Sequence, residues 1–282
     1  MQKNKVAIVG YGNMGAAIAN RIKSDYSVFV FDQDRKKTKN AKGLTVKTTL
    51  KEAVTETNII LLAVKPQDLA KLLKELTTFI HDHLIISIAA GVQAADIESA
   101  LGTDVIRVVR AMPNMPIGIG CGICCLYAGR NIKTADIAEA KDLFETAGAQ
   151  VLLIDDEDRM DVITALSGSG PGYYCYLRTQ KDFDLASIHA QYVETATKYG
   201  FSKKEAEFLW QGTGPSTEIL LEKTGQSPED ICRAVTSKGG TTEEAIKVLQ
   251  RKGSLKEAIK AAIGRARELA KDTHEKVKRS QS

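Results

Sequence analysis

The N-terminal segment places a strand, a glycine-rich turn and a helix in immediate succession. Lys5–Val9 is a short apolar run, long enough for a buried strand and too short for a helix. Gly10-Tyr-Gly-Asn-Met-Gly15 follows at once, and helical periodicity extends over Ala16–Ile22. In such a unit the first glycine permits the tight turn, the second lets the backbone approach a pyrophosphate, and the third allows close helix packing. The segment therefore predicts a dinucleotide-binding site.

A second predicted strand, Ser27–Phe31, ends in Asp32. An acid about 20 residues beyond the glycine turn is where a ribose-binding group belongs. Asp32 would accept hydrogen bonds from an unmodified ribose, which favours NADH. Three cations follow, Arg35, Lys36 and Lys37, and these could instead neutralise the 2′-phosphate of NADPH. The sequence leaves the choice between NADPH and NADH open.

Strand and helix patterns alternate over the N-terminal half, which predicts a parallel, doubly wound sheet. Further strands are expected at Asn58–Val64, Leu84–Ile88 and Val105–Val109, with helices at Gln67–Phe79 and Ala94–Leu101. Ligands bind such sheets outside the carboxyl ends of the strands. The turns expected at that edge are Gly10–Gly15, Ala63–Pro66, Ala89–Gly91 and Met112–Asn114.

From Ile163 onward the strand signal disappears. Ser167–Pro171 is a glycine-rich, hinge-like segment, and Ser202-Lys-Lys-Glu205 has the form of a helix capping box. Arg178–Asp184 interrupts the apolar pattern of Tyr173–Gln191. A helical region of about 110 residues so rich in Ala and Gly is poorly equipped to bury its faces alone, which favours an interleaved homodimer or larger homo-oligomer.

The predicted fold class is an α/β N-terminal Rossmann-type doubly wound sheet followed by an all-α C-terminal dimerisation domain. We expect the dinucleotide-binding domain to cover residues 1–162 and the helical substrate and dimerisation domain to cover residues 163–282.

Val235-Thr-Ser-Lys-Gly-Gly-Thr-Thr242, near the C-terminus, predicts a turn that opens a helix. Exposed backbone N–H groups and hydroxyls in such a turn suit a small carboxylate. The alternative is a solvated loop with a threonine N-cap. The dinucleotide signature at the other end of the chain favours the first interpretation, in which a small anionic substrate is held against a nicotinamide.

Composition excludes several other classes. A net charge of +4 with dispersed basic residues does not indicate a nucleic-acid partner, and no apolar stretch is long enough for a membrane span. The start of the chain runs directly into the first strand, so we expect no secretion signal. Cys121-Gly-Ile-Cys124-Cys125 has a CxxC spacing without a second ligand pair, so buried structural thiols are favoured over zinc or redox chemistry.

The remaining polar signals are weak. His81 and His83 flank Asp82 in a polar connection and are expected to be solvated. An odd number of cysteines without a disulfide framework fits a cytoplasmic location. No metal site is expected.

Six motifs together resemble the pyrroline-5-carboxylate reductase family. They are Gly10–Gly15, Ala63-Val-Lys-Pro-Gln67, Ser87-Ile-Ala-Ala-Gly-Val92, Met112-Pro-Asn-Met-Pro116, Ala165–Pro171 and Val235–Thr242. The resemblance spans nearly the whole chain. It implies a Rossmann domain followed by a helical dimerisation domain, and reduction of the cyclic imine L-1-pyrroline-5-carboxylate to L-proline by NADPH or NADH in proline biosynthesis.

The resemblance also implies site residues. The implied cofactor contacts are Val9, Gly10, Tyr11, Gly12, Asn13, Met14, Asp32, Ala63, Val64, Lys65, Pro66, Ile88, Ala89 and Ala90. The substrate carboxylate would lie on the amides of Gly239, Gly240 and Thr241, with Ser237 and Glu157 lining the pocket. Thr242 would be the catalytic residue, its hydroxyl reaching the ring nitrogen.

Two other functions stay open at this point. One is a related reductase of another cyclic imino acid or a β-hydroxyacid. Hydroxyacid relatives generally rely on a lysine of the helical domain, for which Lys198 and Lys238 are the candidates here. The other is a non-catalytic NAD(P)-binding regulator, which would have no need of the Gly-Gly-Thr-Thr turn.

Overall fold

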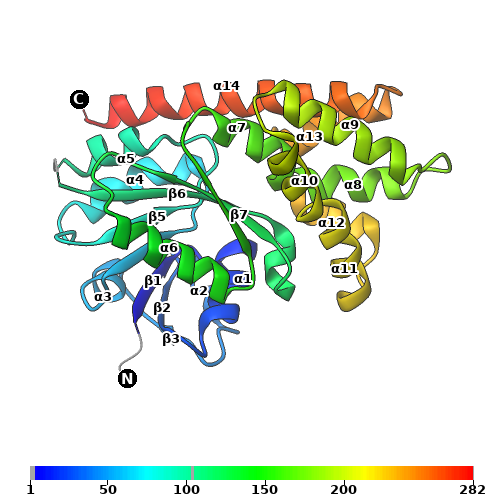
Figure 1. Cartoon of the computed structure of the whole chain (residues 1–282). Helices are drawn as coiled ribbons and strands as arrows, with labels where there is room; N and C mark the ends of the chain where they lie inside the picture. The colour runs from blue at the N-terminus through cyan, green and yellow to red at the C-terminus, as the bar shows by residue number, and fades with distance from the viewer. Residues whose placement is uncertain (1–3, 103–104, 282) are drawn as a thin grey trace.

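The computed structural model of the protein describes residues 4–102 and 105–281 and has a sheet-containing part and a helical part (Figure 1). The sheet has eight strands in the order β3-β2-β1-β4-β5-β6-β7-β8. Their bounds are β1 Lys5–Val9, β2 Ser27–Phe31, β3 Thr45–Val46, β4 Ile59–Leu62, β5 Leu84–Ser87, β6 Arg107–Pro113, β7 Ile123–Ala128 and β8 Gln150–Ile154. The order of the first six strands is that of a dinucleotide-binding sheet, so the predicted fold class is confirmed.

Continuous apolar runs form the central strands because helices cover both faces of the sheet. Every residue of β4 is buried, and Ile8 of β1 lies beside Leu61 of β4 in parallel register. One face packs against α1 and α6, and the other packs against α3, α4 and α5. The helices of this part are α1 Asn13–Ile22, α2 Arg35–Thr38, α3 Leu50–Val54, α4 Pro66–Leu76, α5 Ala94–Leu101 and α6 Thr134–Thr146.

The sheet departs from the expected all-parallel arrangement at β7, which runs antiparallel to β6. This pairing extends β6 as far as Pro113, which lies opposite Cys124. Val105 was expected to begin the strand, but it is 73% exposed and precedes β6. A short 3₁₀ helix, η1 (Met115–Ile119), connects β6 and β7.

Asn114, at the end of β6, is fully buried and joins the two parts of the molecule. Its side-chain amide donates to the carbonyl of Gly212, and its oxygen accepts the N–H of Ile123. The position of Asn114 beyond a strand end suggested a contact with a ligand. Both of its polar atoms are bonded within the protein, which gives Asn114 a structural role.

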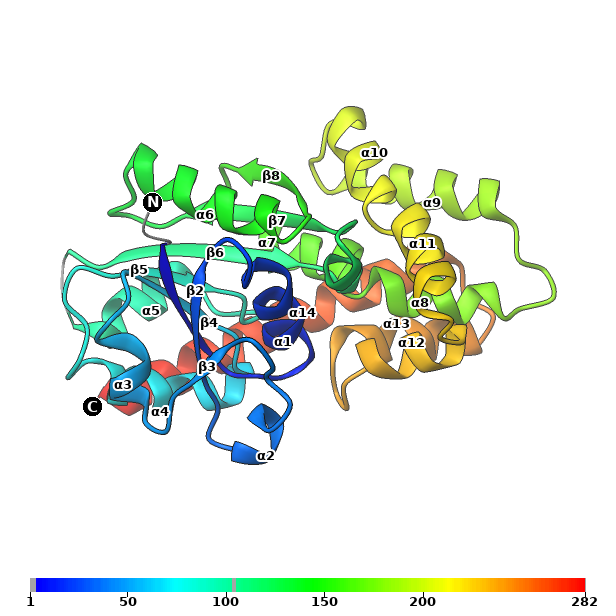
Figure 2. The ribbon, with the colours of Figure 1, turned by 90° about the horizontal axis from the view of Figure 1, so that it is seen from below.

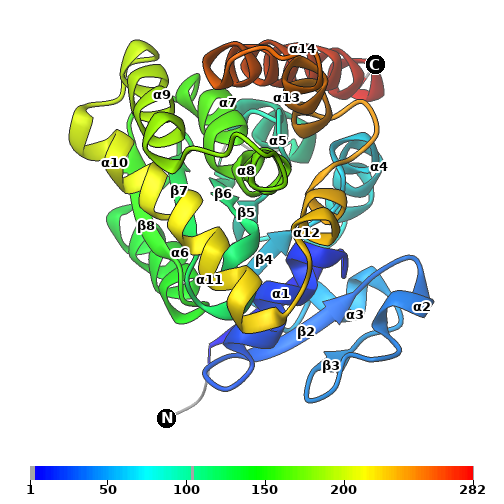
Figure 3. The same cartoon turned by 90° about the vertical axis from the view of Figure 1, so that its right-hand side faces the viewer.

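Helices make up the remainder of the described chain, as expected. They are α7 Arg159–Ile163, the π-helical turn η2 Thr164–Gly168, α8 Gly170–Arg178, α9 Leu185–Lys198, α10 Lys203–Gln211, α11 Gly214–Thr224, α12 Pro228–Val235, α13 Thr241–Gln250 and α14 Leu255–Gln281. Their core includes Tyr173, Tyr192 and Trp210. The capping box at Ser202 and Glu205 is confirmed. Figure 3 views this part end-on, with α8 near the centre of the helices.

Two segments of the helical part differ from what their sequences suggest. Ser167–Pro171 is not an open hinge, because a π-helical turn carries the chain from α7 into α8, with Ser169 N–H donating to Thr164 O. The interruption at Arg178–Asp184 is a connection between two helices, and the Asp184 side chain caps α9 by accepting the N–H groups of Ala186 and Ser187.

The longest helix, α14, runs from the helical part back along the sheet-containing part (Figures 1 and 2). It contacts α9 and α13 at one end and α4 and α5 at the other. Its Ala270 lies against Gly91, and His274 pairs with Asp96 of α5. None of the helices within residues 4–102 and 105–281 combines the length and apolar character that a bilayer crossing requires.

Candidate cofactor and substrate sites

Of the three glycines in the turn after β1, two are closely packed and the third is open. A β-carbon on Gly10 would lie 2.5 Å from the carbonyl oxygen of Ala63, and one on Gly15 would lie 2.1 Å from the carbonyl oxygen of Gly10. A β-carbon on Gly12 would meet no atom within 4 Å in the part of the chain that the structure describes. Gly12 is also the N-cap of α1. The open side of the turn is therefore the N-terminus of a helix, where backbone N–H groups and the helix dipole favour a phosphate.

A cavity of about 340 Å³ adjoins this turn. The predicted cofactor residues that line it are Val9, Gly10, Gly12, Asp32, Ala63, Val64 and Lys65. It is also lined by Phe31, Gln33, Asp34, Lys37, Asp68 and Leu72. Several of these adjoin Asp32 or Lys65 in the sequence, so the dinucleotide fingerprint could have found them. Leu72 lies a turn along α4 from Asp68, and only the packing of that helix brings it into the cavity.

The other predicted cofactor residues do not line this cavity but belong to the same turns or to the neighbouring strand end. Tyr11, Asn13 and Met14 belong to the glycine turn and the start of α1, and Pro66 begins α4. Ile88–Ala90 follow β5, which pairs with β4. Ile88 N–H donates to Leu62 O of β4, so this segment continues the same sheet edge. The turns at the ends of β1, β4 and β5 thus lie side by side, as the sequence predicts.

The second predicted site, Ser237–Thr242, is the connection between α12 and α13. Gly240 is the N-cap of α13, so Thr241 and Thr242 begin the helix and neither caps it. Gly239 N–H donates to the carboxylate of Glu243 at 2.8 Å, and this hydrogen bond holds the pKa of Glu243 below its usual range. Gly240 N–H was expected to face a ligand, but it donates to Ser237 O within the turn. Both glycine N–H groups are therefore bonded within the turn and the first turn of α13.

Thr242 contacts both α8 and α12. Its hydroxyl donates to Val235 O at 3.4 Å, and its methyl group faces Gly172, where a β-carbon would lie only 2.5 Å away. Next to it, the hydroxyls of Ser169 and Thr241 lie 2.7 Å apart. The start of α13 therefore packs against Gly172 and is hydrogen-bonded to Ser169 of the segment that resembled a hinge.

Arg265 of α14 fixes the opposite side of this turn. Its Nε donates to Gly239 O at 2.8 Å, and Nη1 pairs with Glu268. A cavity of about 450 Å³ lies here, lined by Gly239, Glu244, Ala261, Gly264, Arg265 and Glu268. Sequence reasoning did not find Arg265, because the contact joins residues that are far apart in the chain and have no shared motif.

Glu157, which the resemblance assigns to the substrate pocket, is hydrogen-bonded to the sheet-containing part. Its Oε1 accepts hydrogen bonds from Arg110 Nη1 at 2.9 Å and from the backbone N–H of Ala94 at 2.7 Å. Arg110 lies on β6 and is 2% exposed. Within the described residues, the recorded partners of Glu157 are thus at the start of α5 and on β6, and the structure does not join it to Thr242.

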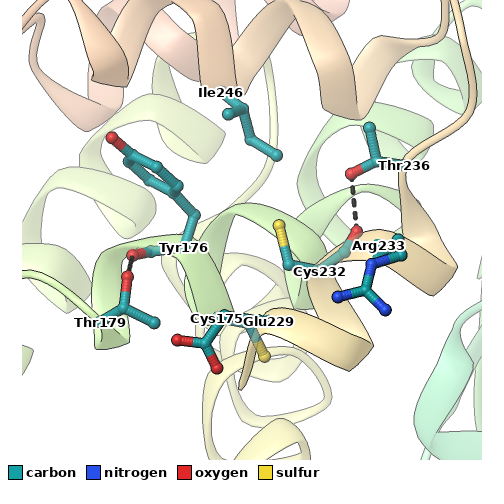
Figure 4. A pocket seen from close by; sticks show the side chains of 8 residues that line it. All are labelled: Cys175, Tyr176, Thr179, Glu229, Cys232, Arg233, Thr236 and Ile246. Atoms are coloured by element: carbon teal, nitrogen blue, oxygen red, sulfur yellow. Dashed lines mark hydrogen bonds between the residues drawn. The ribbon is translucent and has the colours of Figure 1, made fainter. Parts of the chain in front are cut away.

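A third cavity, of about 320 Å³, lies between α8, α12 and α13 (Figure 4). Its thiols are unreactive in character, since burial raises the pKa of Cys175 to about 12 and also raises that of Cys232. Cys124 and Cys125 are buried in β7, as expected of structural thiols, and Cys121 is half-buried. In the part of the chain that the structure describes, His, Cys, Asp and Glu do not gather in threes as a metal site requires.

The open glycine turn, the acid after β2 and the cavity beside them, followed by a separate helical part, are the features of an NAD(P)-dependent oxidoreductase. Comparison with known families agrees. Residues 5–91 match the family model described as NADP oxidoreductase coenzyme F420-dependent, and residues 157–271 match the one described as pyrroline-5-carboxylate reductase dimerisation.

Similar proteins extend over the whole chain. The pyrroline-5-carboxylate reductase of Pseudomonas aeruginosa is 32% identical over 96% of this chain and 98% of its own length, and that of Aquifex aeolicus is 30% identical over 95% and 96%. The solved structure of the Coxiella burnetii enzyme is 30% identical, with a TM-score of 0.63 over 95% of this chain and 99% of the other. The chain belongs to the pyrroline-5-carboxylate reductase family.

Proposed function

We propose that the protein reduces L-1-pyrroline-5-carboxylate to L-proline with NADPH or NADH, as a step of proline biosynthesis. The observation that carries the proposal is the turn at Ser237–Thr242. A carboxylate already accepts the N–H of Gly239 there, and a threonine hydroxyl lies two residues beyond the N-cap. A small cyclic imino acid presents the matching pair of groups, a carboxylate and a ring nitrogen.

The residues at the sheet edge fit the cofactor. The open backbone at Gly12 leaves room where a β-carbon would stand, and Asp32 faces the same cavity. When bound, NAD(P)H supplies the hydride that the imine carbon accepts. We assign to its binding the complete set of residues named from the sequence, from Val9–Met14 through Asp32 and Ala63–Pro66 to Ile88–Ala90.

The protein groups mainly position the substrate. A protonated cyclic imine is already a strong electrophile, so fixing its orientation matters more than a strong general acid. We propose that Gly239 and Thr241 N–H groups hold the substrate carboxylate, with Ser237 and Gly240 shaping the turn. For Gly239 this requires the substrate to displace Glu243. The Thr242 hydroxyl then accepts a hydrogen bond from the iminium N–H and can donate one to the amine as it forms.

The proposal also covers the domain boundary, the oligomeric state and the cellular location. Residues 1–162 form the cofactor domain and residues 163–282 the substrate and dimerisation domain, which is supported by the passage from sheet to helices between Ile154 and Arg159. We propose a homodimer or larger homo-oligomer, since Leu185 and Ile219 of the helical part are exposed. A cytoplasmic location is supported by five free cysteines.

Thr242 variants provide the test, measured as loss of nicotinamide absorbance with pyrroline-5-carboxylate. Thr242→Val keeps the methyl group against Gly172 and removes only the hydroxyl. We expect it to lose about 1–3 kcal/mol of transition-state binding, about 5–150-fold in kcat/KM. Thr242→Ser, which keeps the hydroxyl, should retain most of the activity.

A panel of cyclic imino acids and β-hydroxyacids, assayed in parallel, separates the other functions. Turnover of a hydroxyacid but not of the imine would refute the proposal. Cofactor binding without turnover of any substrate in the panel would point to the non-catalytic regulator instead.

A further inference from the structure

A carboxylate at the carboxyl edge of the sheet, that of Asp32, lies where it can determine which cofactor the enzyme binds. We propose that Asp32 makes the protein selective for NADH over NADPH. This inference rests on the proposed cofactor site but not on the identity of the substrate.

Asp32 is fixed by backbone hydrogen bonds rather than free to turn away. Its Oδ2 accepts the N–H of Tyr11, in the glycine turn, at 2.7 Å. Its Oδ1 accepts the N–H of Asp34, in the turn after β2, at 2.8 Å. The side chain is 8% exposed and lines the same cavity as Gly12. A negative charge is therefore held at the point where the ribose next to the adenine is expected.

The cations that could favour a 2′-phosphate are poorly placed to do so. Of Arg35, Lys36 and Lys37, all within the described chain, Lys37 lines the cavity and the other two do not. Lys37 Nζ lies 3.3 Å from each oxygen of Asp32, so its charge is already paired. A phosphate could recruit Lys37 only by taking it from Asp32.

The charges lining the cavity sum to a negative value. Its carboxylates are Asp32, Asp34 and Asp68, and its cations are Lys37 and Lys65. A 2′-phosphate adds nearly two negative charges beside Asp32, with which it can form no hydrogen bond. The unmodified 2′- and 3′-hydroxyls can instead donate to the carboxylate, at the positions on its two oxygens that Lys37 Nζ occupies. The site thus attracts the ribose of NADH and repels the phosphate of NADPH.

Direct binding tests this without reference to catalysis. The purified protein is titrated with NADH and with NADPH, and each Kd is read from nucleotide fluorescence. For the wild type we expect NADH to bind at least about 10-fold more tightly. Asp32→Asn removes the charge and keeps an oxygen that can accept the Tyr11 N–H. It should lower the ratio of the two Kd values to about one, by weakening NADH and strengthening NADPH.

Asp68→Asn is the matched control, because it removes one carboxylate charge from the same cavity at the start of α4. Because Asp68 has no position beside the ribose, it should change the ratio much less than Asp32→Asn does. Asp32→Ser, which also removes the charge, guards against a folding defect peculiar to the asparagine variant, and circular dichroism checks both.

The outcomes separate this inference from the proposed function. Tighter binding of NADPH by the wild type, an equal effect of Asp68→Asn, or no binding of either nucleotide would overturn the selectivity proposal. Selective NADH binding by a protein that does not reduce pyrroline-5-carboxylate would support it, while refuting the proposed substrate.

Discussion

Gly172 of α8 faces the first turn of α13 at a distance that leaves no room for a side chain. A β-carbon there would lie 2.5 Å from the Thr242 methyl group and 3.2 Å from a methyl group of Val235. Alanine is the better helix former by about 1 kcal/mol, so a purely local effect would stabilise α8. The contact predicts the opposite, because Thr242 and the turn before it must move.

We expect Gly172→Ala to lower stability by about 1–3 kcal/mol and to lower kcat/KM for the imine with little change in cofactor affinity. Gly168→Ala is the control, since its β-carbon would meet Met112 Sδ at an ordinary 3.4 Å. Urea unfolding and steady-state kinetics measure both variants. Equal effects of the two substitutions would show that packing against Thr242 is not the cause.

His83 was expected to be solvated, but it is 7% exposed and its ring is bonded on both sides. Nδ1 accepts the N–H of His81, and Nε2 lies 3.2 Å from Val54 O. Only the neutral ring with its proton on Nε2 satisfies both contacts. The residues next to His83 in the sequence are polar and do not predict its burial, because that burial depends on how α3 packs on the sheet.

This arrangement predicts a loss of stability in acid. Burial lowers the pKa of His83 in the folded protein. As the pH falls through about 6.5, the unfolded chain therefore takes up a proton that the folded protein does not, and the free energy of unfolding decreases. His83→Gln should lose less stability than the wild type between about pH 8 and about pH 5.5. The comparison is made by urea unfolding, and parallel pH dependences would contradict the assignment.

At the scale of the element, the bounds of a strand or helix could be predicted where its own apolar pattern sets them. They could not be predicted where a neighbouring element sets them. β1 and β2 have the bounds that their apolar runs predict, and α5 begins and ends at the expected residues. β6 differs because its end is set by pairing with β7, a strand that reverses direction. No local pattern encodes that reversal. The Ser237–Thr242 turn was predictable as a turn, but its internal hydrogen bonds were not.

Glu157 links two elements of the sheet-containing part, and this gives it a structural role whether or not substrate also reaches it. Removing it would leave Arg110 buried without its carboxylate partner, and one nitrogen of Arg110, Nη2, already has no hydrogen-bond partner among residues 4–102 and 105–281. We expect Glu157→Ala to destabilise the protein by about 3–5 kcal/mol.

Glu157→Gln keeps an oxygen for Ala94 N–H and Arg110 and should cost less. Thermal unfolding of the two variants measures this difference. A folded glutamine variant with an unchanged KM for the imine would show that Glu157 acts only structurally. A raised KM at native stability would instead support the pocket role implied by the family resemblance.

At the scale of the whole molecule, α14 is the element that connects both candidate sites. Its 27 residues span about 40 Å, which is enough to reach from one part to the other. Arg265 fixes the substrate turn through Gly239 O. Farther along, Ala270 meets Gly91, the residue after the cofactor segment Ile88–Ala90. Neither contact could be inferred from sequence, since each joins a helix position to a distant turn.

The contact between α14 and Gly91 can be tested with a matched pair of glycines. Gly91 and Gly102 have φ values of 69° and 70°, so alanine is strained to the same extent at both, by about 1–2 kcal/mol. A β-carbon on Gly91 would also lie 3.0 Å from the backbone nitrogen of Ala270, whereas one on Gly102 would meet no atom of the described residues within 4 Å. Any additional effect at Gly91 therefore reports the approach of α14.

We expect Gly91→Ala to lose about 1–3 kcal/mol more stability than Gly102→Ala, because backbone atoms of α14 cannot move aside as a side chain could. It should also weaken NADH binding, since displacement of Gly91 moves Ile88–Ala90, while Gly102→Ala leaves the Kd unchanged. Urea unfolding and nucleotide titration give the two readouts. Equal losses of stability in Gly91→Ala and Gly102→Ala would mean that the approach of α14 to Gly91 has no effect on stability. A weakened Kd at Gly91 alone would show that α14 holds the cofactor edge of the sheet in position.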